Sequence, residues 1–565
     1  MSAALRSRSR SGEWVVRRLP AVALPLVVLL GLVAPVAQAQ PGRSTSPDPA
    51  SVAARADRSS ARHTLREAQR LFSASPSRPS RAHDPATGEA AVAGTPSHDP
   101  IMTQPDPTLL LLALRRSLPA LSPAERVAAR GILSRPTDGA GQLGGWTRRE
   151  VAHSQTLCGD HVCVHWTSVG DDEPADVDKL GLDGTPGPDT YPDQVDETLH
   201  EMTTVWDEEV GTLGYRAPKT DARPKKLRPV DRRKFDVYLS DVGRKHLYGF
   251  CSPEQNQRRS TAYCVLDNDF APRQFGRFHT ALQDLQVTAA HEFFHAIQFN
   301  YDAGEDAWFM EASAAWIEDV VYPTVNDNLQ YLANSPISRP WQPADIGGSS
   351  LAVYGSWVWL RYLTDRFGID LVHRAWTLAA GPRYSLAALA LALPGGPASF
   401  ARLFADFAAA NTAPRAFYAE GGRYSRYTAR ADLLRRLGRG HATLGWRRIP
   451  GLRHLTAATL TLVPDPGAQH LALRVRTPAG VTSPQVRLVT SRKAGGPVMT
   501  TVPVHHRLAH VVVGFSPTTV TSVRVVVVNA SRRTRCGVGS SWSCRGRPLD
   551  DSSTFSVHAA LVSQP

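Results

Sequence analysis

The side chains best suited to chemistry lie in the segment AAHEFFHAIQFNYDAGEDAWFMEASAAWIED, residues 289–319. His291 and His295 are four residues apart in a stretch with helical character, so both imidazoles leave the same face of one helix. Two neutral imidazoles on one face can bind a single cation without distorting the backbone. Glu292 sits beside His291, where its carboxylate can reach a water molecule on that cation. This is the H-E-x-x-H arrangement of a zinc site that hydrolyses peptide bonds.

The alternative is a core helix that carries two hydrogen-bonded histidines, because a bare H-E-x-x-H pattern often occurs by chance. The apolar neighbours of the polar residues favour a buried site helix, as does the acidic residue on the next helix. In a site of this kind the ion activates water and polarises the scissile carbonyl. Glu292 then takes the proton from the water and hands it to the leaving amine.

Glu311 is the expected third ligand, since a catalytic zinc is often held by two histidines and one glutamate. A helix–turn–helix return over the sixteen residues after His295 brings its carboxylate back to the imidazoles. Its helix has an inward apolar face with small residues, which allows a close approach. Glu318, two turns later on nearly the same face, is the competing ligand. Whichever of the two glutamates does not bind the metal can orient a histidine through a hydrogen bond to its other ring nitrogen. Asp319 has this second option too, but capping or solvent exposure suits it better.

A fourth part is a donor for the oxyanion that forms during hydrolysis, and Tyr354 is the candidate for it. The alternative is a core tyrosine, because most aromatic side chains on helices simply pack. Tyr301, His279 and Tyr263 are weaker candidates. The strand that holds Tyr263 could also be the sheet edge that pairs with an extended peptide.

Strands come first and helices follow in the middle of the chain, which predicts an α+β domain over residues 151–425. The predicted strands are HVCVHW, KFDVYLSDVG and TAYCVLDND, and the predicted helices span 192–215, 281–300, 307–321 and 352–367. From 450 to 565 short β-branched runs alternate with turn residues. Six such runs predict an all-β, sandwich-like or jelly-roll-like domain: ATLTLVPD, HLALRVRT, PQVRLVTS, AHVVVGFS, TSVRVVVVN and STFSVHAALV.

The composition of residues 1–150 indicates segments for export and for proteolytic processing. Residues 1–39 have a basic start, a proline-broken apolar run and a final AQA, which predicts a cleaved signal peptide; an uncleaved membrane anchor is the alternative. Residues 40–150 read as a propeptide without cysteine, disordered over 40–105 and forming one or two short helices over 107–135. Inhibition by this segment would therefore be steric, and Arg148-Arg149 is a candidate cleavage site.

Six cysteines form three local pairs and predict disulfides in an oxidising compartment: Cys158 with Cys163, Cys251 with Cys264, and Cys536 with Cys544. The net charge is +13, and only three of the 51 acidic residues follow residue 450. This placement predicts an arginine-rich solvated surface or contact with an anionic cell-surface polymer. No aromatic–basic interleaving indicates nucleic-acid binding. The acidic runs GDDEPADVD and LDNDF could hold Ca²⁺, although solvated loops fit them better.

The motifs resemble those of the gluzincin metallopeptidases, whose relatives carry HExxH and then a W-x-x-E-[AG]-x-A helix. A closer resemblance is to a group of secreted bacterial HExxH metallopeptidases, through CVHWTSVGDDEP, LGYRAPKTD, FDVYLSDVG, LYGF, HEFFHAIQ and EASAAWIEDVVYP within residues 155–370. The resemblance implies a zincin-like fold, zinc ligands His291, His295 and Glu311, and Glu292 as base. The short His295–Glu311 gap, Ala315 in place of an acid and the missing G-x-M-E-N segment depart from those families, so substrate preference does not transfer.

The sequence thus predicts a secreted, monomeric, zinc-dependent endopeptidase made as a zymogen, acting on protein or peptide substrates. Two other readings stay open. One is a catalytically idle zincin-like protein used for binding or adhesion, which the intact set of motif residues disfavours. The other is a zinc amidase that acts on cell-wall material.

Overall fold

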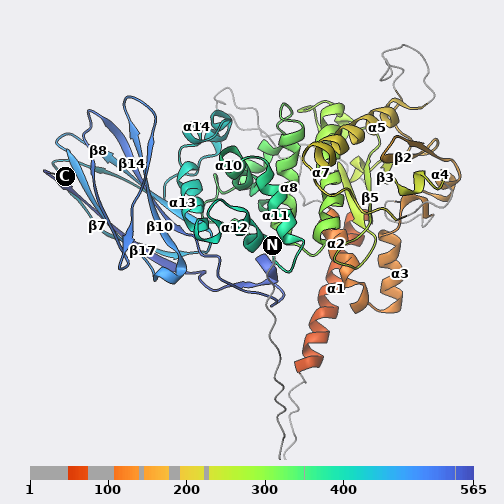
Figure 1. Cartoon of the computed structure of the whole chain (residues 1–565), viewed down its shortest axis with the longest axis horizontal. Coiled ribbons are helices and arrows are strands. Elements are labelled where there is room, and N and C mark those ends of the chain that lie inside the picture. The colour runs from red at the N-terminus through yellow and green to blue at the C-terminus, as the bar shows by residue number, and fades with distance from the viewer. Residues whose placement is uncertain are drawn as a thin grey trace, which may run out of the picture. The chain divides into compact units, whose positions relative to one another are not determined.

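A five-stranded mixed sheet carries the N-terminal half of the fold (Figure 1). The computed structural model describes residues 49–73, 107–138, 145–176, 191–221, 228–348, 350–540 and 542–564. The predicted signal peptide therefore lies outside the described residues. Residues 53–565 form one unit, and of the preceding unit, residues 1–52, the structure describes only residues 49–52.

The strand order of this sheet is β1-β2-β3-β5-β4, with β2, β3 and β5 parallel and both edge strands antiparallel to their neighbours. The strands are β1 (Ser154–Cys158), β2 (Val162–Thr167), β3 (Phe235–Ser240), β4 (Gly249–Pro253) and β5 (Ala262–Asp267). β2, β3, β4 and β5 are buried along their whole length because both sheet faces are covered. This explains why β3 and β5 carry apolar side chains on both sheet faces.

Helices α5 (Asp193–Trp206) and α7 (Ala281–Asp302) cover one face of the sheet, and α8 (Ala307–Val321) packs on α7. A π-helical turn, η3 (Asp207–Thr212), extends α5. Thr280 and Gln283 form a capping box that sets the start of α7, and 17 of its 22 residues are buried. The predicted limits of α8 agree with the structure, and those of α7 nearly so. The helix predicted over 192–215 begins as expected, but α5 ends at Trp206 and η3 continues it only to Thr212.

The N-terminal helices cover the opposite face of the same sheet. They are α1 (Pro49–Ser73), α2 (Pro107–Ser117), α3 (Pro123–Ile132) and α4 (Arg148–Ala152). Phe72 and Trp146 share an apolar cluster with Tyr238, Tyr263 and Val265 of the sheet. The prediction of a disordered segment over 40–105 is wrong for α1, because its Ala- and Leu-bearing face finds a partner in this cluster. The segment 107–135, predicted to form one or two short helices, forms α2 and α3.

A second group of helices follows α8 and completes the apolar core. These are α9 (Ala352–Gly355), α10 (Trp357–Phe367), α11 (Asp370–Ala379), α12 (Ser385–Ala392), α13 (Phe400–Ala410), α14 (Pro414–Phe417) and α15 (Gly421–Tyr424). The helix predicted over 352–367 is divided at Ser356, whose hydroxyl donates to the carbonyls of Ala344 and Ala352. A short α6 (Pro272–Phe275) lies between β5 and α7.

The C-terminal region is all β and begins at residue 433, earlier than predicted. One sheet has the order β11-β10-β14-β8-β6, a second β12-β13-β9-β17-β7, and β15 pairs with β16. The strands are β6 (Leu433–Leu437), β7 (Thr443–Leu452), β8 (Thr456–Pro464), β9 (His470–Arg476), β10 (Pro484–Arg492), β11 (Val498–Thr501), β12 (Val504–His505), β13 (Leu508–Gly514), β14 (Val520–Asn529), β15 (Thr534–Arg535), β16 (Arg547–Pro548) and β17 (Ser553–Val562). Inward side chains of both five-stranded sheets share one apolar core.

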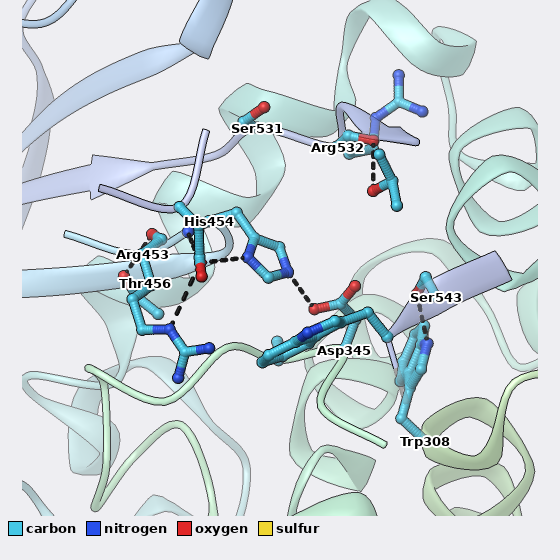
Figure 2. Close-up of polar contacts among 12 residues, drawn as sticks. Trp308, Asp345, Arg453, His454, Thr456, Ser531, Arg532 and Ser543 are labelled. Carbon is cyan, nitrogen blue, oxygen red and sulfur yellow. Dashed lines mark hydrogen bonds and ion pairs between the residues drawn. The ribbon is translucent and has the colours of Figure 1, made fainter. Parts of the chain in front are cut away.

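Helix α13 packs against β10 and β14, so the helical and all-β regions are joined by an extensive contact. The buried Arg487 of β10 donates to Asp406 of α13 at 2.6 Å. A second polar contact is centred on the buried His454, which lies 2.6 Å from Asp345 and 2.9 Å from Asp551 (Figure 2). Close by, Trp308 Nε1 donates to Ser543.

The three predicted disulfides are present: Cys158–Cys163, Cys251–Cys264 and Cys536–Cys544. They are consistent with an extracellular protein. Among the described helices, none has the length and apolar character needed to cross a bilayer.

Candidate metal centre

Helices α7 and α8 bring together the three predicted ligands. The Nε2 atoms of His291 and His295 lie 3.2 Å apart. Glu311 Oε2 on α8 lies 3.4 Å from Nε2 of His291 and 3.6 Å from Nε2 of His295. All three side chains are buried, and among the described residues they are the one cluster suited to a metal ion.

These separations match the ligand spacing of tetrahedral zinc. With bond lengths of about 2.0–2.1 Å, neighbouring ligand atoms around such an ion are separated by about 3.4 Å. Within the described residues, neither carboxylate oxygen of Glu311 has a hydrogen-bond partner, although the residue is fully buried. A buried carboxylate without hydrogen bonds is costly unless a cation compensates it. The donor set therefore fits a divalent ion of the zinc type.

The second nitrogen of each imidazole faces an acceptor in the protein. His291 Nδ1 lies 2.5 Å from Oε1 of Glu318, and His295 Nδ1 lies 2.8 Å from Oε1 of Gln298. The Gln298 amide in turn donates to the carbonyl of Met310 on α8, which ties the two helices together. Hydrogen-bond acceptors at Nδ1 place the lone pair at Nε2, where a metal would bind. Glu318 thus contacts the Nδ1 side of the His291 ring, and Glu311 lies on its Nε2 side.

The charges of the site shift the pKa values of its carboxyl groups in opposite directions. Burial alone would raise the pKa of Glu311, but the attraction of His295 and His291 outweighs it and lowers that pKa to about 2. Burial dominates at Glu318 and raises its pKa to about 8 despite the bond to His291. Glu311 is therefore the anion of the pair near neutral pH, as a metal ligand must be.

Glu292 follows His291 on α7 and is buried, as the three ligand candidates are. Its Oε2 accepts a hydrogen bond of 3.0 Å from the hydroxyl of Thr108, at the start of α2. Asp319, the remaining acid of the cluster, forms an ion pair with Arg361 instead of contacting a histidine.

The candidate oxyanion donors lie in different places. Tyr354 is fully buried, and its ring centroid lies 6.0 Å from that of His291. Tyr301 contacts the backbone N–H of Arg216, and His279 faces Asp284 near the start of α7. Tyr263 donates to the carbonyl of Ser134 within the apolar cluster under the N-terminal helices. The structure therefore brings Tyr354 next to the imidazoles and places Tyr263 on the opposite face of the sheet.

The expectation that Tyr263 lies on an edge strand is wrong. Its strand, β5, runs between β3 and β4, and β4 forms the edge. The sequence GFCSP of β4 contains a glycine and a proline, so it gives a weak strand signal and was not predicted. Its position follows from pairing with β5 in the register Cys251 opposite Cys264.

The sequence also does not identify Gln298, Tyr331 and Thr108 as members of the site. Gln298 is seven residues after His291 and could have been found from helical spacing alone. Tyr331 stacks on Tyr354 with ring centroids 4.8 Å apart, and Thr108 reaches the site from a distant segment. No sequence spacing predicts either contact, since both depend on tertiary packing.

The two acidic runs considered for calcium lie against each other. The side-chain amide of Asn268 donates to the carbonyl of Glu173 at 2.7 Å. Asp267 accepts backbone hydrogen bonds from Gly243 and Phe270, and Asp172 accepts one from Asp241. These carboxylates thus organise the loops themselves, and calcium binding stays a sequence-based expectation.

Residues 146–390 match the model of DUF6055, a family of unknown function. The matched segment contains the five strands of the first sheet together with α7 and α8. The description of that family assigns no activity, so the resemblance to zinc peptidases rests on the motif residues alone. No curated protein matches the chain.

Proposed function

We propose that this protein is a secreted zinc-dependent endopeptidase with a zincin-like catalytic domain. The observation that carries the proposal is the meeting of His291, His295 and Glu311 at 3.2–3.6 Å, with Glu292 next to His291 in α7. Zinc held there would supply a Lewis acid that polarises the peptide carbonyl and makes water more acidic. The disulfides and the predicted signal peptide support secretion.

The residues of the chain account for the other parts of the reaction. Glu292 accepts the proton of the attacking water and passes it to the departing amine. Glu318 and Gln298 hold the two imidazoles in orientation through their Nδ1 atoms. Tyr354, beside His291, is the candidate donor to the oxyanion. A peptide substrate would reach these groups along the edge strand β4.

Two substitutions test this function. Glu292→Gln removes the base while keeping its size, so it should retain one zinc per chain and lose peptide hydrolysis by at least about a thousandfold. His295→Ala should lose both the zinc and the hydrolysis. The zinc content of each variant and its cleavage of a mixed peptide library are measured on the same preparation, after proteolytic processing. The two measurements separate the role of Glu292 as base from that of His295 as metal ligand. Full activity of Glu292→Gln would rule out Glu292 as the base.

The outer face of the second C-terminal sheet is the proposed contact for an anionic cell-surface polymer. Arg474 and Arg476 of β9 and Arg448 of β7 are exposed, and Arg476 lies over the ring of the exposed Trp446 at 4.2 Å. No strand of this sheet contains an acidic residue. Reversing Arg474 and Arg476 to glutamate should weaken retention on a polyanionic polysaccharide column without changing peptide hydrolysis. Equal retention of this variant would contradict the proposal.

A further inference from the structure

The metal centre is closed in this structure, although a catalytic zinc must keep one position open for water or substrate. The ligand candidates and Glu292 are at most 6% exposed. The first turn of α2 contributes to this closure. Thr108 is fully buried, and its hydroxyl donates to Glu292 Oε2 at 3.0 Å.

Helix α2 also covers the free edge of the sheet. Backbone groups alternate in direction along a strand, and Glu254 N–H points toward Thr261 beside β5. The groups of Cys251 and Pro253 therefore point away from β5. Cys251 N–H donates to Thr108 Oγ1 at 2.9 Å, and the Pro253 carbonyl accepts from Arg115 Nε at 2.9 Å. Both would otherwise be available to an extended peptide.

We propose that α2 is an inhibitory element that occupies the substrate edge and the general base of the same chain. This inference rests on the proposed peptidase function. The Thr108 hydroxyl makes two bonds at once. It donates to the carboxylate that must take a proton, and it accepts from the edge N–H that would otherwise donate to a substrate carbonyl. Release of α2 from β4 would free both groups together.

The rest of the N-terminal region has a different role. Arg135 is 2% exposed and bonds Asp236 on β3, Glu254 just after β4, and Asp221. Trp146 is fully buried and donates to Ser240. Arg135 and Trp146 thus complete the face of the sheet opposite α7. Activation therefore requires that α2 is displaced while Arg135 and Trp146 stay in place. Displacement of α2 alone is therefore a smaller change than removal of the whole predicted propeptide, residues 40–150.

Hydrogen exchange and hydrolysis, measured on the full chain, test the proposal. In Thr108→Val/Arg115→Ala, the valine keeps the size of the threonine but removes the hydroxyl. The Cys251 amide should exchange about tenfold faster than in the wild type, and the inward-facing Ser252 amide should keep its rate. Hydrolysis of a quenched casein substrate should rise by a similar factor. Ser117→Ala is the matched control, since it removes a hydroxyl of α2 that bonds only within the helix.

The readouts distinguish this proposal from the proposed function. Unchanged exchange at Cys251 would overturn the covering role of α2. Faster exchange with hydrolysis equal to that of an active wild type would overturn the inhibitory role and leave the peptidase function standing. Faster exchange with no hydrolysis in any chain would uphold the cover and count against the peptidase function. If the double variant fails to fold, Arg115→Ala alone should give a smaller increase in both quantities.

Discussion

Glu318 Oε1 lies 2.5 Å from Nδ1 of His291, so a carboxyl group on α8 orients an imidazole on α7 through the ring nitrogen opposite Nε2. A metal-binding histidine depends on such a partner for its orientation and basicity. Glu318→Ala should therefore weaken zinc binding by about 10- to 100-fold, and Glu318→Gln, which can still accept the hydrogen bond, by less. Competition with a chelator of known affinity measures the change. Asp319→Asn is the control, since Asp319 faces Arg361, and equal affinity of Glu318→Ala would contradict the assignment.

Removal of the metal should lower the thermal stability of the protein. Glu311 is fully buried with no hydrogen-bond partner among the described residues, so a bound cation compensates a charge that folding buries. At a free zinc concentration 1,000 times the Kd, binding adds about 4 kcal/mol to the free energy of unfolding. Calorimetry with and without a chelator should show a drop in Tm of several degrees. His295→Ala should show no difference between the two conditions, and a zinc-dependent Tm in that variant would place the ion elsewhere.

The site helices are predictable from the sequence because their signals are local. His291 and His295 share a face by spacing alone, and the helix that carries Glu311 has a clear apolar period. Six C-terminal strands are predicted from alternation, whereas the arginine-rich β6 and β7 are missed because little in their composition marks a buried face.

The role of the N-terminal region could not be predicted in the same way. Local sequence indicates α2 and α3, and the Ser122–Glu125 capping box is present as expected. Nothing local reveals that Thr108 bonds Glu292, 184 residues away, or that Arg135 enters the sheet. Such contacts are decided when distant segments pack, and the removal of residues 40–150 as a propeptide stays a prediction.

Arg135 should be essential for the stability of the sheet. Its guanidinium lies 2.5 Å from Asp236, 2.5 Å from Asp221 and 2.8 Å from Glu254. Arg135→Met would leave these acids without their cation and should reduce the free energy of unfolding by about 3–5 kcal/mol. Urea denaturation measures this loss. Arg130→Met, at an exposed site on α3, should stay within about 0.5 kcal/mol of the wild type.

The contact of His454 with Asp345 and Asp551 should make stability depend on pH. Burial alone would lower the pKa of His454, but the two carboxylates outweigh it and raise the pKa to about 9 (Figure 2). The unfolded value is about 6.5, so the protonated ring stabilises the fold fully below pH 6.5. This contribution, on the order of 3 kcal/mol, is lost as the pH rises through about 9.

His454→Gln should therefore unfold at a lower temperature than the wild type at pH 6.5, and the gap should narrow by pH 10. Arg453 is retained in this variant and lies 3.4 Å from Asp551. His510→Gln, on the exposed side of β13, is the matched control and should follow the wild type at every pH. Calorimetry across this range measures the three Tm values. A gap that does not change with pH would mean that the buried ring is neutral in the folded protein, and that its hydrogen bonds alone join the helical and all-β regions at this point.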